Sequence, residues 1–531
     1  MALPLPLSNV RGLRSLAVAL FVFLALCLVW LLNSDHISER VAILAGQGNG
    51  QQQPASSNAA SSTLPPPPPP PRASDTSGSA HIVNDDTPLL RDIAQYYIDF
   101  PLNSRPYRNK YGELGRRTRI LRDAIAHLES SSSSPTSSSE QEDHLLLEQL
   151  ATSLFPFLLN QPSNPNSTTP LSDLRSTIVP GSKGIIIPTG DRTIRFAAHL
   201  IAQLRRILGS TLPIQIVYAG DADLSPDNRK ELAAIPGDAH GPPLEFLDIY
   251  SVFDDATLLF TSSASGGWAV KAFAALATHF EQVVVLDADA VFLQRPEVLL
   301  AHPAFERSGA LLFHDRLLWQ HGFQDRHSWW REEIRRPSAA MNKSRVWTED
   351  YAEECDSGVV VLDKGRLEVL MGLLHTCWQN MFDVRDDCTY RITYGDKETW
   401  WMGQEMAGST YEFSSHYGGI VGWEESHDDG GRKVCSFVIA HVDTADRLLW
   451  YNGGLLKNKL KFDDAYEVPE KWMIDADWLK GGSKEAMSCI VNGTINDLTR
   501  EEKGVLARSI EEAKEMDKVF HNVFHNKKGK G

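Results

Sequence analysis

The sequence predicts an α/β protein in which a mixed, mainly parallel sheet is flanked by helices. Short apolar runs at 184–187, 213–218 and 244–249 are typical of buried strands. Segments with helical spacing alternate with these runs, for example 194–208, where apolar residues recur on one stripe. Alternation of strands and helices indicates parallel strands joined by crossover helices.

The first 81 residues are predicted to contain no folded domain. Residues 16–32 carry no charge and follow Arg11 and Arg14, which predicts a cytoplasmic tail at 1–15 and a type II transmembrane signal anchor at 16–32. A cleaved signal peptide is the alternative interpretation. Residues 33–81 are rich in Gln, Ser and Pro, and this composition predicts a disordered stalk.

The remaining chain divides into three predicted regions. Residues 82–175 contain helical patterns with low-complexity breaks and are expected to form a small helical neck. Residues 183–480 hold the alternating pattern and are expected to form the main α/β domain. Residues 481–531 are expected to form a C-terminal helix and a basic tail.

Charge and cysteine content restrict the possible partners. The chain of 531 residues has 68 acidic and 52 basic side chains, a net charge of −16, which argues against nucleic acid as a partner. Five of the six cysteines follow the predicted anchor, and their disulfide pairing is left open. Asn166, Asn342 and Asn492 begin N-x-[ST] sequons and are candidate glycosylation sites in a lumenal domain.

The candidate metal site lies in the stretch 280–293, where an apolar run ends at Asp287-Ala288-Asp289. The carboxyl end of a strand is the edge at which open α/β sheets bind ligands. Residues i and i+2 of a strand point to the same side, so the two carboxylates can converge on one Mn²⁺ or Mg²⁺ ion. Solvated aspartates in a turn are the alternative. That interpretation is preferred for a second copy, Asp475-Ala476-Asp477, because no strand is predicted before it.

Six segments, in this order and spacing, resemble the fungal Golgi α-1,3-mannosyltransferase family, whose members are GT-A type glycosyltransferases. The segments are GIIIPTGD at 184–191, LPIQIVYAGDADLS at 212–225, FEQVVVLDADAVFL at 280–293, ECDSGVVVLDK at 354–364, YGDKETWW at 394–401 and AHVDTADRLLWYNG at 440–453. The resemblance covers roughly residues 183–461. A Trp- and Arg-rich segment inside it, 319–347, is either part of a substrate cleft or an irregular insertion.

The resemblance implies a GT-A-like nucleotide-sugar-binding sheet and a metal-dependent, retaining reaction. Mannose would pass from GDP-mannose, held with Mn²⁺ or Mg²⁺, to a mannose-bearing glycan of a glycoprotein or mannan, in an α-1,3 linkage. It further implies a single-pass type II protein of the Golgi membrane whose catalytic domain is lumenal.

The resemblance also assigns roles to residues at matching positions. The implied metal ligands are Asp287, Asp289 and His441; the implied donor-binding residues are Thr189, Gly190, Asp191 and Lys271; the implied catalytic residues are Asp356, Asp396 and Glu398. Each has an ordinary structural alternative, such as helix capping for Asp396 and Glu398. Trp400, Trp401 and Trp450 either stack on sugars or pack in the core.

Two other functions fit parts of the pattern. Residues 287–291 match the D-x-D-x-[TV] motif of haloacid-dehalogenase-like phosphatases, in which Asp287 would be the nucleophile. That motif normally follows the first strand of its domain, whereas about 100 residues of strand-helix pattern precede it here. The third hypothesis is a non-catalytic lumenal protein that binds nucleotide sugars.

Overall fold

The computed structural model describes residues 87–131, 138–235, 241–426, 431–461, 464–483 and 485–525. The predicted anchor at 16–32 and stalk at 33–81 lie outside the described residues. Within these ranges, no helix combines the length and apolar character that crossing a membrane requires. Residues 82–531 form one compact unit, and the following description concerns that unit alone.

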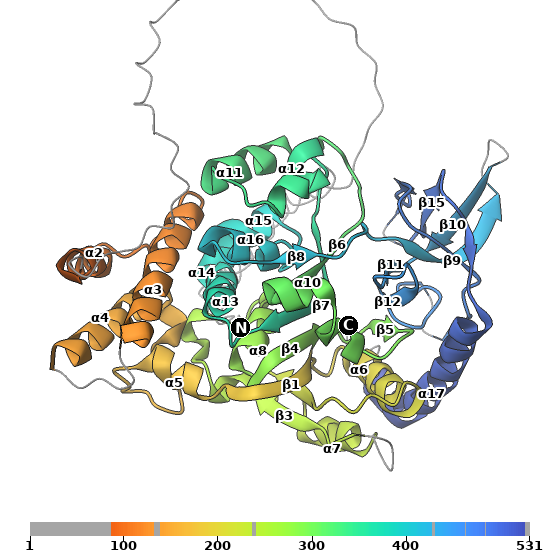
Figure 1. The fold of residues 1–531 in the computed structure, drawn as a ribbon. Coiled ribbons are helices and arrows are strands. Elements are labelled where there is room, and N and C mark those ends of the chain that lie inside the picture. The colour runs from red at the N-terminus through yellow and green to blue at the C-terminus, as the bar shows by residue number, and fades with distance from the viewer. Residues whose placement is uncertain are drawn as a thin grey trace, which may run out of the picture. The chain divides into compact units, whose positions relative to one another are not determined.

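The centre of the unit is a seven-stranded sheet with the strand order β3-β2-β1-β4-β7-β6-β8 (Figure 1). Its strands are β1 (Val179–Pro188), β2 (Ile214–Tyr218), β3 (Glu245–Asp248), β4 (Phe280–Leu286), β6 (Ala310–His314), β7 (Cys355–Asp363) and β8 (Glu412–Phe413). Neighbouring strands are parallel except that β7 runs antiparallel to both β4 and β6. The predicted mixed, mainly parallel sheet is therefore confirmed.

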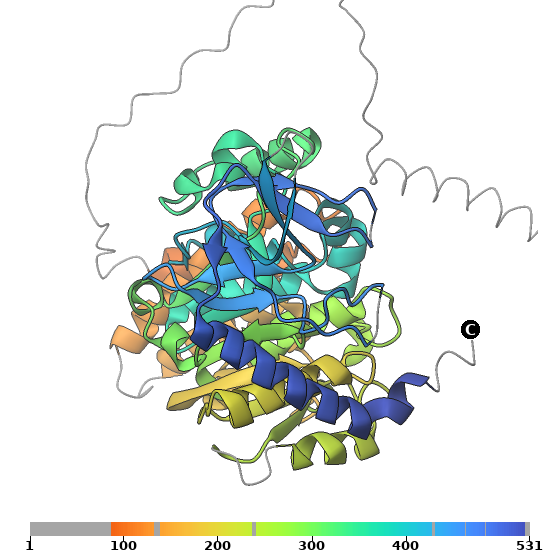
Figure 2. The ribbon, with the colours of Figure 1, turned by 90° about the vertical axis from the view of Figure 1, so that its right-hand side faces the viewer.

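Alternating side chains of the central strands build two apolar layers, because successive residues of a strand point to opposite faces. Ile186 and Val285 belong to a core with the helices α8 (Gly266–Ala277), α13 (Leu367–Gln379) and α16 (Thr399–Ala407). Ile185 and Val284 belong to a core with α6 (Ile194–Ala202) and α17 (Arg500–His525) on the other face. Figure 2 shows α17 running along this second side.

Shorter helices connect these elements. They are α7 (Pro226–Ala234), α9 (Glu297–Leu300), α10 (Pro303–Ser308), α11 (Gln324–Ile334), α12 (Arg345–Glu349), α14 (Phe382–Val384) and α15 (Tyr390–Ile392). The segment 319–347 thus contains α11 and the start of α12 rather than irregular chain alone.

The predicted neck consists of the helices α2 (Thr87–Asp99), α3 (Tyr111–Ser131), α4 (Ser138–Leu154) and α5 (Pro170–Ser176). These helices share the core of α13 and α16: the ring of Tyr111 lies 5.0 Å from that of Trp378. A Cβ atom on Gly115 would lie 2.3 Å from the carbonyl oxygen of Met406, so α3 approaches α16 at backbone distance. The neck is therefore packed into the folded unit.

The remaining described strands form two smaller sheets. A three-stranded sheet contains β11 (Ile439–Val442), β12 (Leu448–Asn452) and β5 (Ala290–Phe292), in that order. A six-stranded sheet contains β14 (Asp477–Leu479), β15 (Ser488–Val491), β10 (Arg432–Ser436), β9 (Ile420–Ser426), β13 (Lys471–Met473) and β16 (Asn496–Asp497). Two expectations are corrected: the strand β13 precedes the second Asp pair, and this sheet continues beyond residue 480.

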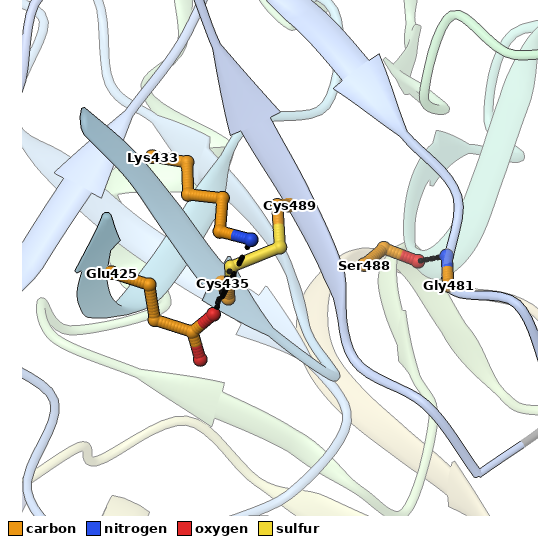
Figure 3. Close-up of a disulfide and its surroundings, with 6 residues drawn as sticks. All are labelled: Glu425, Lys433, Cys435, Gly481, Ser488 and Cys489. Carbon is orange, nitrogen blue, oxygen red and sulfur yellow. Dashed lines mark hydrogen bonds and ion pairs between the residues drawn. A yellow bond between two sulfur atoms is a disulfide. The ribbon is translucent and has the colours of Figure 1, made fainter. Parts of the chain in front are cut away.

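A disulfide joins Cys435 of β10 to Cys489 of β15, two residues that are 54 positions apart (Figure 3). The other described cysteines, Cys355, Cys377 and Cys388, are buried thiols. The sequence left this pairing open because cross-strand neighbours in a sheet are set by register, which spacing alone does not reveal.

Candidate functional site

The candidate site lies at one edge of the central sheet, where the parallel strands β1, β2, β3 and β4 end. Because β7 runs in the opposite direction, it begins at the edge where β4 and β6 end. Asp287 after β4, Asp315 after β6 and Asp356 at the start of β7 therefore lie along the same edge. The backbone N–H of Asp287 donates to the carbonyl of Gly358 at 2.9 Å, which fixes the first Asp pair to β7.

Lys271 connects the first Asp pair to the segment before α16. Its ammonium group lies 2.9 Å from Asp287 Oδ1 and 3.0 Å from Asp396 Oδ2, and it donates to Ser357 Oγ at 2.9 Å. Burial alone would lower the pKa of Lys271, but the charges of Asp287 and Asp396 raise it above its ordinary value. Lys271 is therefore a buried counter-ion for two carboxylates.

Asp289 is held from the other side by the segment after β12. Its backbone carbonyl accepts hydrogen bonds from the N–H groups of Gly453 and Gly454, at 3.2 and 2.7 Å. Its carboxylate forms an ion pair with Lys459. The two aspartates of the pair therefore have different ammonium partners, which come from segments almost 190 residues apart in the chain.

Asp356 lies behind the Asp pair and is fully buried. Its Oδ2 lies 3.0 Å from Nε2 of His441, and its Oδ1 accepts a hydrogen bond from the Asn452 amide at 3.1 Å. Burial disfavours the charged form, but the interaction with His441 lowers the pKa of Asp356 below its usual range. The imidazole of His441 stacks on Trp450 with ring centroids 4.3 Å apart.

Gly358 allows β12 to approach β7 at this point. A Cβ atom there would lie 2.7 Å from the side-chain nitrogen of Asn452 and 2.9 Å from the ring of Trp450. The three-stranded sheet therefore packs directly against the strand that carries Asp356.

Glu398 lies next to the start of β7, and both of its carboxylate oxygens accept hydrogen bonds from other residues of the protein. Its Oε1 accepts hydrogen bonds from the backbone N–H groups of Glu354 and Cys355, at 3.1 and 3.3 Å. Its Oε2 accepts one from the indole of Trp401 at 2.6 Å. Burial raises the pKa of Glu398 to about 8. With no exposed surface, Glu398 ties α16 to β7 rather than facing a ligand.

Three of the predicted donor-binding residues, Thr189, Gly190 and Asp191, directly follow β1. Thr189 donates its backbone N–H to Val217 at 3.0 Å, and a Cβ atom on Gly190 would collide with Asp223. Asp191 Oδ1 accepts hydrogen bonds from the Ser225 N–H at 3.1 Å and from the Asn228 amide at 2.7 Å. Asp191 thus holds the start of α7, and the backbone around Gly190 is packed against the loop after β2.

The first Asp pair fits a hard divalent cation. The side chains of Asp287 and Asp289 are 26% and 20% exposed, so solvent reaches both. With Asp396 they make three carboxylates against the ammonium groups of Lys271 and Lys459, an excess of one negative charge when all are ionised, and Asp356 is paired with His441. Carboxylate oxygens are the ligands that Mn²⁺ and Mg²⁺ prefer, and phosphate oxygens and water usually complete the shell.

His441 does not join this group, because its Nε2 faces Asp356. Among the described residues, the only group of three or more His, Cys, Asp and Glu residues whose ligand atoms all lie within 4.8 Å of one another is Glu425, Cys435 and Cys489. Those two cysteines form the disulfide. The described geometry therefore does not bring His441 together with Asp287 and Asp289 as a third ligand.

Trp400, Trp401 and Trp450 are each at most 1% exposed. They therefore pack in the core.

Three further residues of the site, Lys459, Lys397 and Asn452, were not predicted from the sequence. Lys397 forms an ion pair with Asp315 at the end of β6. The sequence feature that could have pointed to Lys459 is the Gly453-Gly454 pair, which begins six residues before it. A turn at this pair brings the chain next to Asp289.

The sheet and its acidic edge place the protein in the class of α/β proteins that bind a ligand at the carboxyl ends of parallel strands. Residues 182–443, just under half of the chain, match the family described as "Mannosyltransferase putative". The matched segment runs from β1 to the end of β11 and contains all ten residues to which the resemblance assigns roles, but not Trp450.

Individual relatives are distant. The alpha-1,3-mannosyltransferase MNT3 of Saccharomyces cerevisiae is 31% identical over 294 residues, which cover 49% of this chain and 45% of that protein. The alpha-1,3-mannosyltransferase MNT2 of the same yeast is 26% identical over 317 residues, 54% of each protein. The chain spans about half the length of these relatives. The solved structure of mouse xyloside xylosyltransferase 1 aligns at 14% identity with a TM-score of 0.29, over 43% of this chain and 82% of that one, a likeness that carries no argument.

Proposed function

We propose that the protein is a metal-dependent, retaining hexosyltransferase that moves mannose from GDP-mannose to a mannose-bearing glycan of a glycoprotein or mannan. The observation that carries this proposal is the Asp pair at the end of β4, inside the segment that matches a mannosyltransferase family. The names of MNT3 and MNT2 support mannose as the sugar and α-1,3 as the linkage.

The acidic edge suggests how the donor is held. Asp287 and Asp289 would bind Mn²⁺ or Mg²⁺, which supplies Lewis-acid stabilisation of the charge that develops on the departing diphosphate. Lys271 keeps the Asp287 carboxylate in place through its ion pair of 2.9 Å. Lys459 adds a positive charge beside Asp289, where a diphosphate would lie. The backbone around Gly190 would take the nucleoside, since it lies at the same sheet edge.

Net transfer replaces the bond between mannose C1 and the diphosphate oxygen by a bond between C1 and an acceptor hydroxyl oxygen, and the hydroxyl proton is released with the diphosphate. Asp356 and Asp396 are 0% and 3% exposed. We therefore assign both to positioning: Asp396 holds Lys271, and Asp356 holds His441 and the segment before Gly453. The retaining outcome comes from the family resemblance.

The proposal includes a location: the Golgi membrane, with a type II anchor at 16–32 and a lumenal catalytic domain. The disulfide supports an oxidising compartment, because disulfides are rare in cytosolic proteins. The three sequon residues Asn166, Asn342 and Asn492 are exposed, as glycosylation requires.

The test is GDP release from GDP-mannose by the full-length protein in detergent with Mn²⁺, with and without an α-mannoside. Acceptor-stimulated release that chelation and Asp289→Ala both abolish is the expected result. Asp123→Ala, an exposed residue of α3, is the matched control and should keep full activity. Turnover of UDP-sugars alone would overturn the donor assignment. Phosphate release from a phosphomonoester, without turnover of any sugar nucleotide, would favour the phosphatase hypothesis. Metal-dependent GDP binding without turnover would favour the non-catalytic one.

A further inference from the structure

A groove of about 500 Å³ lies between the loop after β6 and the strand β14. This volume is within the range of about 300–1,000 Å³ that is usual for small-molecule sites. Four aromatic side chains line it: Trp319, Tyr351, Tyr417 and Trp478. Trp319 is 48% exposed, although tryptophan is highly buried on average. Rigid amphipathic rings at a solvent-exposed surface are typical of recognition sites.

The backbone of the groove is held in an unfavourable conformation at one lining residue. Trp319 has φ of 48°, in the left-handed region. A bulky residue in this region is a genuine outlier, and such strain is concentrated at ligand sites. Trp478 is fixed in turn, because its indole donates a hydrogen bond to the Gly418 carbonyl at 2.9 Å. The backbone at Trp319 and the side chain of Trp478 are thus both constrained by the protein.

The groove adjoins the acidic edge of the central sheet. The N–H of Gly418, a lining residue, donates to the carbonyl of Asp315 at 3.1 Å, and the N–H of Asp315 donates to the carbonyl of Glu354 at 2.7 Å. The hydroxyl of Tyr417 donates to the Glu354 carboxylate at 3.2 Å. Glu354 is two residues before Asp356, so a ligand in the groove would lie next to the end of β7 that faces the Asp pair.

The charges of the lining favour a neutral, hydroxyl-rich ligand. Arg345 and Lys480 provide two positive charges, and Asp475 and Asp477 provide two negative ones. A nucleoside diphosphate would need an excess of positive charge, which this balance does not supply. Hexose rings fit this lining. Their C–H faces pack on aromatic rings, and their hydroxyls form hydrogen bonds with carboxylate, guanidinium and ammonium groups.

We propose that this groove binds the acceptor: a neutral, mannose-bearing oligosaccharide whose chain packs on Trp319 and Trp478 and whose reactive end reaches the Asp315 side. The identity of the sugar rests on the proposed function. Binding of an oligosaccharide by the groove does not require transferase activity, so the two proposals can fail separately.

The test is isothermal titration of the full-length protein in detergent with α-linked mannotriose, in parallel with titration by GDP and Mn²⁺. Trp319→Ala and Trp478→Ala are each expected to weaken mannotriose binding at least about tenfold, as loss of a central aromatic anchor usually does. GDP binding by the same samples reports that the fold is intact. Tyr96→Ala, which removes an aromatic ring that is 56% exposed on α2, is the matched control and should bind mannotriose like the wild type.

Three outcomes would overturn the proposal: no binding of mannotriose by the wild type, unchanged binding by both tryptophan variants, or displacement of mannotriose by GDP. The last would assign the groove to the donor. If mannotriose binds through Trp319 and Trp478 but GDP-mannose is not turned over, the groove proposal stands and the proposed function fails.

Discussion

The tripeptide Asp-Ala-Asp occurs twice, at 287–289 and 475–477, and each copy follows a strand. The first follows β4, seven residues long and central in the seven-stranded sheet, and its carboxylates pair with Lys271 and Lys459. The second follows β13, which is three residues long and belongs to the six-stranded sheet. Its carboxylates pair with His416 at 2.6 Å and with the amide of Asn492 at 3.0 Å.

The comparison teaches that the motif itself does not define the site. Both aspartates of the second copy are exposed, and its partners lie on the surface, where they need no metal for neutralisation. The first copy lies where several parallel strands end together, with two further buried carboxylates beside it. What distinguishes the two is the sheet edge on which each lies and the charge of its surroundings.

The largest expected difference is in catalysis. Asp287→Asn with Asp289→Asn should reduce kcat/KM for GDP release by at least about 10³-fold, because metal stabilisation of a leaving group contributes several kcal/mol. Asp475→Asn with Asp477→Asn should reduce it by at most about tenfold. Initial rates at saturating Mn²⁺ measure both, and equal losses in the two double variants would refute the distinction.

The next difference is in stability. Lys271→Met leaves Asp287 and Asp396 without their buried counter-ion and should lower the free energy of unfolding by about 3 kcal/mol. His416→Gln removes a partner of Asp475, which is 54% exposed, and should cost at most about 1 kcal/mol. Urea unfolding followed by tryptophan fluorescence gives both values. Adding Asp396→Asn to Lys271→Met should recover part of the loss, and no recovery would argue against the pairing.

Stabilisation by a bound ligand should also depend on the first Asp-Ala-Asp copy and not on the second. GDP with Mn²⁺ at about 100 times its dissociation constant should stabilise the wild type by about 2.7 kcal/mol. Asp289→Asn should lose this stabilisation, and Asp477→Asn should retain it. Thermal unfolding with and without EDTA measures the shift. An equal shift in Asp289→Asn and the wild type would remove the first copy from the metal site.

The smallest expected effect is on the affinity for the acceptor when the second Asp-Ala-Asp copy is changed. Asp477 lines the groove, and its loss as a hydrogen-bond acceptor should weaken mannotriose binding by about threefold, since one exposed hydrogen bond contributes about 0.5–1.5 kcal/mol. Titration calorimetry resolves a change of this size. Weaker GDP binding in the same variant would mean that the two copies share one ligand.

The predictable part of the structure is the part encoded by local pattern. The apolar runs of β1, β2 and β4 and the polar residues that end them are adjacent in sequence, so the position of the first Asp pair at a strand end followed from them. The contacts of Lys459 with Asp289 and of His441 with Asp356 join segments 170 and 85 residues apart, and no local period encodes such pairs. The strand β13 was missed because three residues show no measurable alternation.

The insertion of β7 between β4 and β6 has a consequence for synthesis. β4 ends at Leu286 and β7 begins at Cys355, about 70 residues later, and β6 pairs only with β7 and β8 among the described strands. At about 5–20 residues per second, a ribosome needs several seconds to make the missing neighbour. During that time the valine-rich edge of β4 is unpaired, and such an edge is a template for aggregation. Chaperone capacity in the expression host should therefore limit the yield of soluble protein more than the stability of the finished fold does.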